Sequence, residues 1–307
     1  MPAHTYEFLQ LDVFTQTALA GNPLAIFPDA RGLNDAEMQA LAREMNLSET
    51  TFILPQDGAT EAREGKKVRI FTVEAELPFA GHPTLGTALY LYASDSNQTK
   101  PAEITLDLKA GKIPVRFTPK SENPSANRVD GQVFGEMRQR DPEFGTPLPR
   151  EGVARVIGIA VDEIPREWPI QPVSTGLTFT IVPFCNRQTL SDLKFSYIQA
   201  ADFLRNTGAN FFYFLCPERH EGRLEARARM FFYGGEDPAT GSAAGCAASW
   251  MVQHGVAKSD EQAVIRQGIE CRRPSEMHVR ATREGERVTN VRVGGFAVEI
   301  LRGTVVL

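Results

Sequence analysis

Hydrophobic positions in the first third of the chain fall into short apolar runs and stretches with helical spacing. PLAIF (23–27), TTFIL (50–54) and KVRIFTV (67–73) have the length and β-branched content of strands. Between the first two, apolar residues recur at helical spacing over 38–45. A second helix is predicted over PTLGTALYLY (83–92), with proline at its first position, where the missing N–H costs nothing.

The second half of the chain repeats this order. TFTIVPF (178–184), NFFYFLC (210–216) and RLEARARMFFY (223–233) predict strands, and a helix is predicted near 199–206. Another helix follows Pro238. The pattern therefore predicts two similar units that each mix strands with helices.

Constant offsets support the repeat. Arg69 and Arg229 are 160 residues apart, and Pro83 and Pro238 are 155 apart. The segments that begin at these prolines, PTLGTA and PATGSA, both have glycine, a small hydroxyl residue and alanine at the same places. Several such matches in order predict two related domains. The polar segment 119–131, rich in proline, is the predicted linker.

Composition limits the classes of function. The chain has 307 residues, which suits two domains, and a net charge of −5, which argues against a general nucleic-acid or acidic-membrane surface. No stretch approaches the ~18 apolar residues of a membrane span. The N-terminus lacks a basic segment followed by an apolar run, so we expect a cytoplasmic protein.

The four cysteines are spread along the chain without a CxxC pair. This spacing predicts free thiols rather than a disulfide framework, and it predicts no metal site. The chain has no glycine-rich phosphate-binding motif, no HExxH and no GxSxG.

The segment after Pro238 is a helix almost without bulky side chains. Glycine costs about 1 kcal/mol against alanine in a helix, so Gly241 and Gly245 must be offset by something else. Small residues allow close approach by a sheet or a ligand. We therefore expect this helix inside a curved sheet, with its N-terminus exposed to an opening as an anion site.

Three ionisable residues are candidates for chemistry. The 155-residue offset matches His82 with Asp237, and each comes directly before the proline of its helix. Glu49 has no acidic counterpart in the second half, so the repeated fold does not require it. Glu74 and Glu76 compete with Glu49 for a role as the acid/base. The ordinary alternatives are a helix cap for Asp237, a structural histidine and a solvated glutamate.

Four segments resemble the PhzF-like family, which is named for an isomerase of phenazine biosynthesis: DVFT…GNPLAIF, SET, ELPFAGHPTLGTA and GGEDPATGSAA. The resemblance implies an α+β fold like that of diaminopimelate epimerase. It has two domains related by a pseudo-twofold axis, each a curved mixed β-sheet wrapped around a central helix. We place the domains at 1–120, with a return strand near 295–307, and at 129–290.

The resemblance also implies roles for matching residues. Glu49 matches the family's acid/base glutamate, His82 the histidine of its GHP motif and Asp237 the aspartate of its DPATGS motif. Substrate-binding residues are implied at Gly81, Gly241 and Ser242. The resemblance further implies a small carboxylate-bearing substrate, no cofactor and a homodimer.

Two alternatives to a single-base isomerase remain open. A racemase or epimerase removes a proton from one face and delivers one to the other, which needs two groups, and His82 and Asp237 would supply them. One glutamate, in contrast, can move a proton between two carbons on the same face. The other alternative is a ligand-binding protein without catalysis on the same fold.

Overall fold

The computed structural model describes residues 4–97, 99–120, 128–232 and 235–307. They form two compact units, one ending at Arg138 but including residues 294–307, the other spanning residues 139–293. The predicted linker falls largely on residues 121–127, which lie outside the described part. The first unit continues past it because the strand Val133–Arg138 pairs with Gly111–Pro119.

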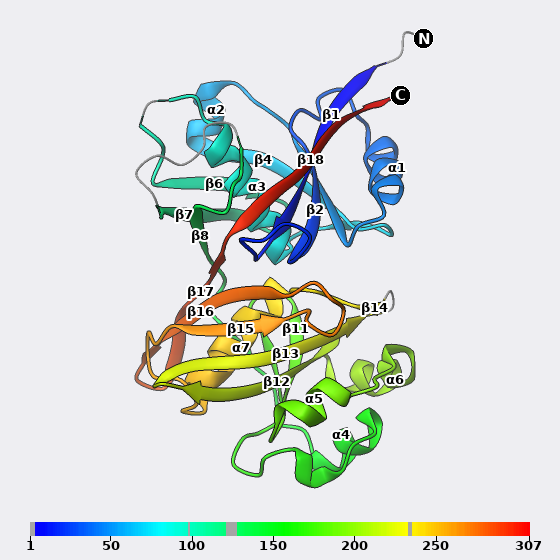
Figure 1. The fold of residues 1–307 in the computed structure, drawn as a ribbon, viewed down its shortest axis with the longest axis vertical. Coiled ribbons are helices and arrows are strands. Elements are labelled where there is room, and N and C mark those ends of the chain that lie inside the picture. Colours follow the sequence, from blue (N-terminus) through cyan, green and yellow to red (C-terminus); the bar gives the residue numbers. More distant parts are fainter. Residues whose placement is uncertain (1–3, 98, 121–127, 233–234) are drawn as a thin grey trace. The chain divides into compact units, whose positions relative to one another are not determined.

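The first unit is a mixed sheet around one helix (Figure 1). Its strands pair in the order β18-β1-β2-β3-β4-β6-β7-β8, with β2–β3 and β4–β6 parallel and the other pairs antiparallel. The strands are β1 Thr5–Val13, β2 Asn22–Phe27, β3 Glu49–Ile53, β4 Lys66–Phe71, β5 Glu76–Leu77, β6 Glu103–Leu108, β7 Gly111–Pro119, β8 Val133–Arg138 and β18 Ala297–Val306. The helices are α1 Asp35–Met45, α2 Gly58–Glu64 and α3 Gly81–Ser94.

The second unit repeats this pairing. β11–β12 and β13–β15 are parallel, while β10–β11, β12–β13 and β15–β16 are antiparallel. The strands are β9 Glu143–Phe144, β10 Gln171–Ser174, β11 Thr178–Pro183, β12 Phe211–His220, β13 Arg223–Phe232, β14 Gly235–Glu236, β15 Ala263–Gln267, β16 Ser275–Glu284 and β17 Arg287–Gly295. The helices are α4 Arg150–Ile157, α5 Arg187–Asp192, α6 Tyr197–Thr207, α7 Gly241–Gln253 and a 3₁₀ turn at Val161–Glu163.

Each unit has a buried helix made of small residues, as the sequence predicts. In α3 a Cβ at Gly86 would lie 2.7 Å from Leu24 Cδ2 and 2.8 Å from Val13 Cγ2, so strands β1 and β2 approach the helix backbone closely. In α7 every residue up to Val252 is buried. Burial among the strands offsets the poor helix propensity of these segments. The predicted α+β class, with a mixed sheet around a central helix in each unit, is confirmed.

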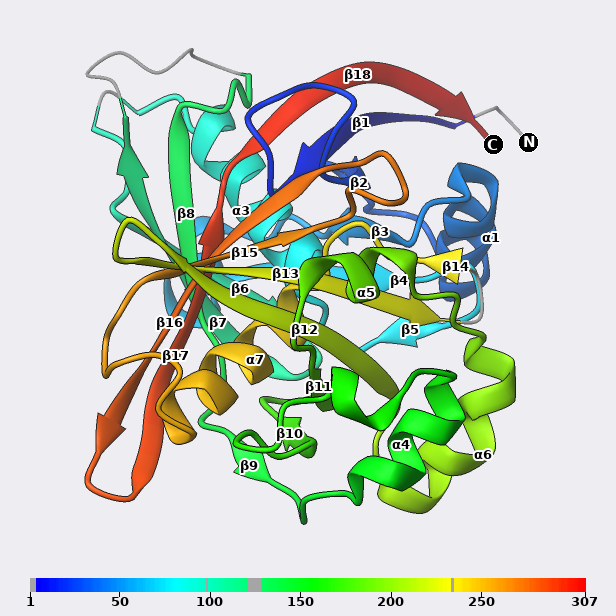
Figure 2. The same ribbon diagram turned by 60° about the horizontal axis from the view of Figure 1, so that its bottom comes forward.

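The other helices pack on the outside of the sheets. α1 begins with a capping box between Asn34 and Glu37 and buries Met38 and Leu41 against aromatic residues of the first sheet. In the second unit α4, α5 and α6 lie together, away from α7 (Figure 2). The helices with candidate residues at or just before their N-termini are the two central ones, α3 and α7.

The predicted helix starts are wrong by a few residues. α3 begins at Gly81, so Pro83 is its third residue, and α7 begins at Gly241, three residues after Pro238. Proline is tolerated through the first turn because the first four N–H groups have no intrahelical partner. Pro83 therefore could not fix the first residue of α3, and Pro238 lies before α7.

Candidate active site

Glu49 and His82 lie side by side in the first unit. Glu49 is the first residue of β3 and His82 is the second residue of α3. His82 Nε2 is 3.6 Å from Glu49 Oε2, and Asn22 Nδ2 at the start of β2 is 3.3 Å from His82 Nδ1. Parallel pairing of β2 with β3 brings the first residues of both strands to the start of α3.

Burial keeps the imidazole of His82 neutral. The ring is 4% exposed, and burial lowers the pKa of His82 to about 3, with a hydrogen bond to the Pro23 backbone acting in the opposite direction. At neutral pH the contact with Glu49 is therefore between a carboxyl group and an uncharged ring. His82 Nε2 has no hydrogen-bond partner among the described residues. This geometry presents a neutral ring nitrogen beside a carboxylate, an arrangement suited to proton transfer.

The buried ring predicts a dependence of stability on pH. Below the ordinary pKa of 6.5 the unfolded chain protonates His82, whereas the folded chain does so only near pH 3. The contribution is complete above pH 6.5 and declines as the pH falls to 3, by up to ~1.4 kcal/mol per pH unit. Between pH 7.5 and 5, we expect the free energy of unfolding to fall by about 2 kcal/mol less in His82→Asn than in the wild type. Urea unfolding at both pH values measures this difference. Equal losses in the two proteins would contradict this assignment.

In the second unit Asp237 lies between β14 and α7. Its backbone N–H donates to the Met230 carbonyl at 3.0 Å, which continues the β13–β14 pairing by one residue. The carboxylate is largely buried, and Thr240 Oγ1 lies 2.6 Å from Asp237 Oδ2. Thr240 is the N-cap of α7. Asp237 therefore does not occupy the N-cap position of the ordinary alternative, and its carboxylate meets the side chain of the N-cap residue instead.

Gly241 and Ser242 are the first two residues of α7, and both are buried. Gln139 Nε2 donates to the Gly241 carbonyl at 2.9 Å and its Oε1 accepts from Thr175 Oγ1 at 2.7 Å. The first backbone N–H groups of a helix have no partner within it and carry the positive end of its dipole. Such an end binds a carboxylate readily.

The repeat pairs different residues from those matched in the sequence. Arg69 and Arg229 hold equivalent ion pairs to Glu76 and Glu236, and the helices begin at Gly81 and Gly241, all at an offset of 160. At that offset His82 corresponds to Ser242, and the counterpart of Asp237 is Leu77. The predicted match of His82 with Asp237 is therefore wrong. It followed the PTLGTA and PATGSA letters, which are out of step by five residues.

The competing glutamates belong to the structure of the first unit. Glu76 forms a two-point ion pair with Arg69, at 2.8 and 3.0 Å, and lies 3.5 Å from Lys109. The hydrogen bond from Arg69 holds the pKa of Glu76 below that of an ordinary glutamate, so Glu76 is a weaker base. Glu74 lies in the exposed turn between β4 and β5. Glu49 remains the better candidate for the acid/base.

The cysteines are free thiols and none lies at the start of a central helix. Cys246 is the sixth residue of α7, and burial raises the pKa of its thiol to about 11. Thiol-based proton transfer therefore has no support from these residues. Within the described ranges no group of three or more His, Cys, Asp and Glu side chains is arranged to hold a metal ion.

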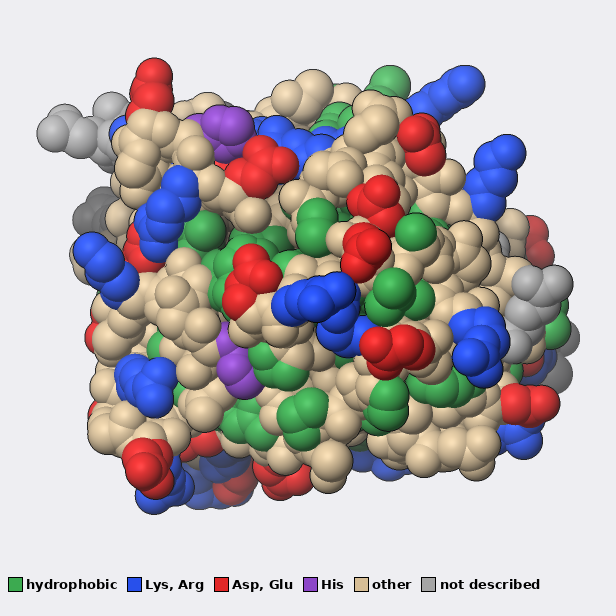
Figure 3. Space-filling view, turned by 90° about the horizontal axis from the view of Figure 1, so that it is seen from below, with side chains coloured by type: hydrophobic (Ala, Val, Ile, Leu, Met, Phe, Trp, Pro, Cys, Tyr) green, Lys and Arg blue, Asp and Glu red, His purple; other side chains and the backbone are tan. Residues whose placement is uncertain are grey.

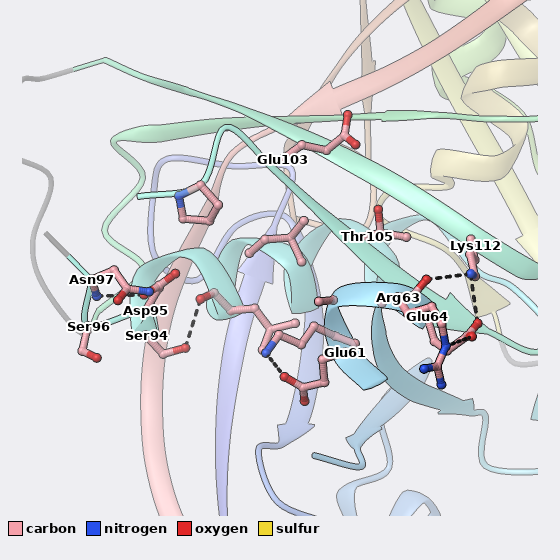
Figure 4. Close-up of a pocket in the computed structure, with 16 residues that line it drawn as sticks. Glu61, Arg63, Glu64, Ser94, Asp95, Ser96, Asn97, Glu103, Thr105 and Lys112 are labelled. Atoms are coloured by element: carbon pink, nitrogen blue, oxygen red, sulfur yellow. Dashed lines mark hydrogen bonds and ion pairs between the residues drawn. The ribbon is translucent and has the colours of Figure 1, made fainter. Parts of the chain in front are cut away.

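A separate cavity of about 660 Å³ lies at the other end of α3 (Figure 4). Ser94 in its lining is twelve residues, or about 18 Å, along the helix from His82. Lys112 points toward Glu64, at 2.9 Å, and toward the Arg63 carbonyl, at 3.0 Å. None of the predicted site residues lines this cavity, so it is not part of the candidate active site.

Sequence reasoning missed the residues that support the candidates. Asn22 lies in Gly-Asn-Pro, which is a turn signal and not a site motif, and nothing in the sequence pointed to Gln139, Gln267 or Thr240. Asn22, Gln139 and Gln267 reach partners far away in the sequence, so no local pattern reveals them, and Thr240, three residues after Asp237, looks like an ordinary helix cap. A polar residue with no exposure, such as Asn22 or Gln267, is the signal that the structure supplies.

Residues 11–303 match the family model PhzC-PhzF, described as phenazine biosynthesis-like protein. The chain belongs to this family. A relative from Pseudomonas fluorescens, named trans-2,3-dihydro-3-hydroxyanthranilate isomerase, is 35% identical over 98% of this chain and 100% of its own length. Relatives that match over their full length are named as isomerases. This member of the PhzC-PhzF family is therefore an isomerase.

Solved structures agree with this assignment. A predicted epimerase from Pseudomonas aeruginosa has a TM-score of 0.80 at 33% identity and covers 98% of this chain and 99% of its own. A PhzF-family protein from Bacillus anthracis has a TM-score of 0.84 at 26% identity, covering 99% and 100%. This PhzC-PhzF family member thus has the same fold as PhzF proteins and epimerases.

Charges of both signs are mixed on one face of the molecule (Figure 3). Figure 3 shows acidic and basic side chains interspersed with hydrophobic ones on the face seen from below. Among the described residues no helix has the length and apolarity needed to cross a membrane. A small molecule is the partner that suits an isomerase.

Proposed function

We propose that this protein is a cofactor-independent isomerase that shifts a proton between two carbons of a small, carboxylate-bearing substrate. Glu49 takes the proton from one carbon as a carboxylate and returns it to the other carbon as a carboxylic acid, while the double bond moves between them. Each turn restores the starting carboxylate. Proton transfer by a carboxylate requires no cofactor.

One observation carries this proposal: Glu49 Oε2 lies 3.6 Å from the uncharged ring of the buried His82. As a neutral neighbour, His82 itself does not favour the ionised form of Glu49 in the way that a protonated histidine would. The positive end of α3 favours negative charge nearby. His82 then orients the substrate and stabilises charge that develops during the transfer.

We assign substrate binding in the second unit to the start of α7. The N–H groups of Gly241 and Ser242 suit a carboxylate, and Asp237 would face positive charge on the substrate. Gly81 at the start of α3 is the matching position in the first unit. The family resemblance supports these roles, and it also supports a homodimer.

The repeat argues against a racemase with two bases. The counterpart of His82 is Ser242, whose hydroxyl is not a base at neutral pH. Asp237 has no counterpart of its own kind, since Leu77 stands in its place. In the part of the chain that the structure describes, a carboxyl group beside a histidine at the start of the central helix is therefore found in the first unit alone.

The test is the reaction of trans-2,3-dihydro-3-hydroxyanthranilate in heavy water, followed by proton NMR. A single carboxyl group that takes and returns the proton leaves part of the original hydrogen on the receiving carbon. We expect isomerised product with hydrogen in that position above the solvent background. Deuterium alone, introduced at the original carbon with inversion, would support a two-base epimerase instead. An unchanged compound would exclude trans-2,3-dihydro-3-hydroxyanthranilate as the substrate.

A further inference from the structure

A chain of buried polar side chains ends on Asp237 in the second unit. Tyr213 on β12 donates its hydroxyl to Gln267 Oε1 at 3.0 Å, and Gln267 Nε2 donates to Thr240 Oγ1 at 2.9 Å. Thr240 Oγ1 in turn contacts Asp237 Oδ2 at 2.6 Å. We propose that Tyr213, Gln267 and Thr240 are positioning residues that fix the Asp237 carboxylate for the isomerisation. This inference rests on the role proposed above for Asp237.

The hydrogen bonds along this chain have only one consistent direction. The Asp237 backbone carbonyl can only accept, so Gln267 Nε2 is the donor on that side and Oε1 accepts from the Tyr213 hydroxyl on the other. One of the Nε2 hydrogens goes to Thr240 Oγ1 and the other to the Asp237 backbone carbonyl at 2.7 Å. Thr240 already accepts from this amide, so its own hydrogen points at Asp237 Oδ2. The carboxylate is held in one orientation.

Burial strengthens the chain and keeps its donors protonated. Tyr213 and Gln267 have no exposed surface, and Thr240 is 6% exposed. Hydrogen bonds are stronger in such surroundings and are costly to leave unmade. Burial, with the nearby Asp237, holds the pKa of Tyr213 well above its ordinary value, so its hydroxyl remains a donor at every working pH.

The fold does not require this chain, because the first unit has the same strand pairs and helix start without it. There Leu77 and Ala80 stand at the positions of Asp237 and Thr240. Lys66 and Ala226 are equivalent positions of the repeat. Leu108 comes two residues after the strand partner of Lys66, and Gln267 comes two residues after the strand partner of Ala226, so Leu108 stands at the position of Gln267. Apolar side chains thus suffice in one copy of the repeat. The polar set in the other copy points to a task at Asp237.

The experiment compares Thr240→Val, which removes only the hydroxyl at nearly constant shape, with Thr240→Ser, which keeps it. Loss of a hydrogen bond to a charged group predicts a fall in kcat of about ten- to a hundredfold for the valine variant, with a smaller change in KM. The serine variant should recover kcat to within about threefold of the wild type. Tyr213→Phe should also lower kcat, but by less, since three hydrogen bonds separate Tyr213 from the Asp237 carboxylate.

Thr87→Val is the matched control. It also removes a buried threonine hydroxyl, which donates to Thr51 Oγ1 at 3.0 Å in the first unit. We expect it to lower stability as much as Thr240→Val does but to retain kcat. Equal losses of kcat in the two variants would show that buried hydroxyls matter only for folding, and would overturn the proposal.

An activity-free measurement tests the geometry. In ¹⁵N-labelled protein the side-chain amide of Gln267 should exchange slowly with solvent and become faster in Thr240→Val. Fast exchange in the wild type would also overturn the proposal. Asp237→Asn separates the two levels of inference. If it leaves kcat unchanged, the proposed role of Asp237 fails. If it abolishes turnover while Thr240→Val has no effect, only the positioning chain fails.

Discussion

Replacing Glu49 by Gln is expected to lower kcat about 10³-fold while KM changes by about threefold or less, because the amide keeps the size of the side chain but cannot carry a proton. The substituted chain should still fold, since Glu49 lies at the start of β3 and not in its buried part. The measurement is the rate of isomerisation of trans-2,3-dihydro-3-hydroxyanthranilate by proton NMR.

Glu76→Gln is the matched control in the same unit. It changes a carboxyl group that also lies near the start of α3 but is committed to Arg69. We expect Glu76→Gln to lose stability and to keep its kcat at a temperature where it is folded. A retained rate in Glu49→Gln would exclude Glu49 as the proton carrier and would favour a reaction that uses His82 and Asp237 as two bases.

His82 gives this prediction a second arm. Because the ring is neutral and only 3.6 Å from Glu49, its removal disturbs the transition state without removing the base. We therefore expect kcat in His82→Asn to fall by less than in Glu49→Gln. The order of the two effects distinguishes a proton carrier from a residue that orients and stabilises charge.

The sequence predicted the elements because apolar spacing reports local structure. β2 and β3 both lie within a residue of their predicted segments, and β12 is longer than predicted because it continues into a polar hairpin end. Helix starts were less accurate, since Pro83 suits the third position of α3 as well as the first. An apolar period fixes which face is buried but not where a helix begins.

The candidate site was predictable only in part. Glu49 and His82 were identified from their motifs, and the structure adds that they are in contact although 33 residues apart. The support for Asp237 could not be foreseen. Gln267 reaches it only because β15 pairs in parallel with β13, and strand pairing of this kind leaves no local mark in the sequence. Similar letters even misled, because PTLGTA and PATGSA occupy different positions along their helices.

Replacing Arg229 by Met is expected to destabilise the second unit by about 3–5 kcal/mol. Its guanidinium group binds both oxygens of Glu236 at 2.8 Å, and its Nη1 donates to the carbonyls of Leu190, Ser191 and Leu193. The side chain is 7% exposed, so methionine would leave a buried carboxylate and three carbonyls without their donor. Asp237 follows Glu236 directly, so the same hairpin carries the candidate site.

The internal repeat supplies the control for this prediction. Arg69→Met breaks the equivalent pair with Glu76, but the other partners of Arg69 are the exposed Asp35 and the Met38 sulfur in place of three carbonyls, and 21% of its side chain is exposed. We expect a smaller loss, since water can replace part of what the arginine provided. Both tryptophans, Trp168 and Trp250, lie in the second unit, so their fluorescence during urea unfolding follows Arg229→Met, while circular dichroism follows both variants.

Removing the stranded charge should recover part of the stability. Adding Glu236→Gln to Arg229→Met replaces the uncompensated carboxylate with a neutral amide, and we expect the double variant to be at least about 1 kcal/mol more stable than Arg229→Met alone. The carbonyls of the α5 segment would still lack a donor, so recovery should be incomplete. Full recovery would assign the whole effect to Glu236, and no recovery would assign it to the three carbonyls.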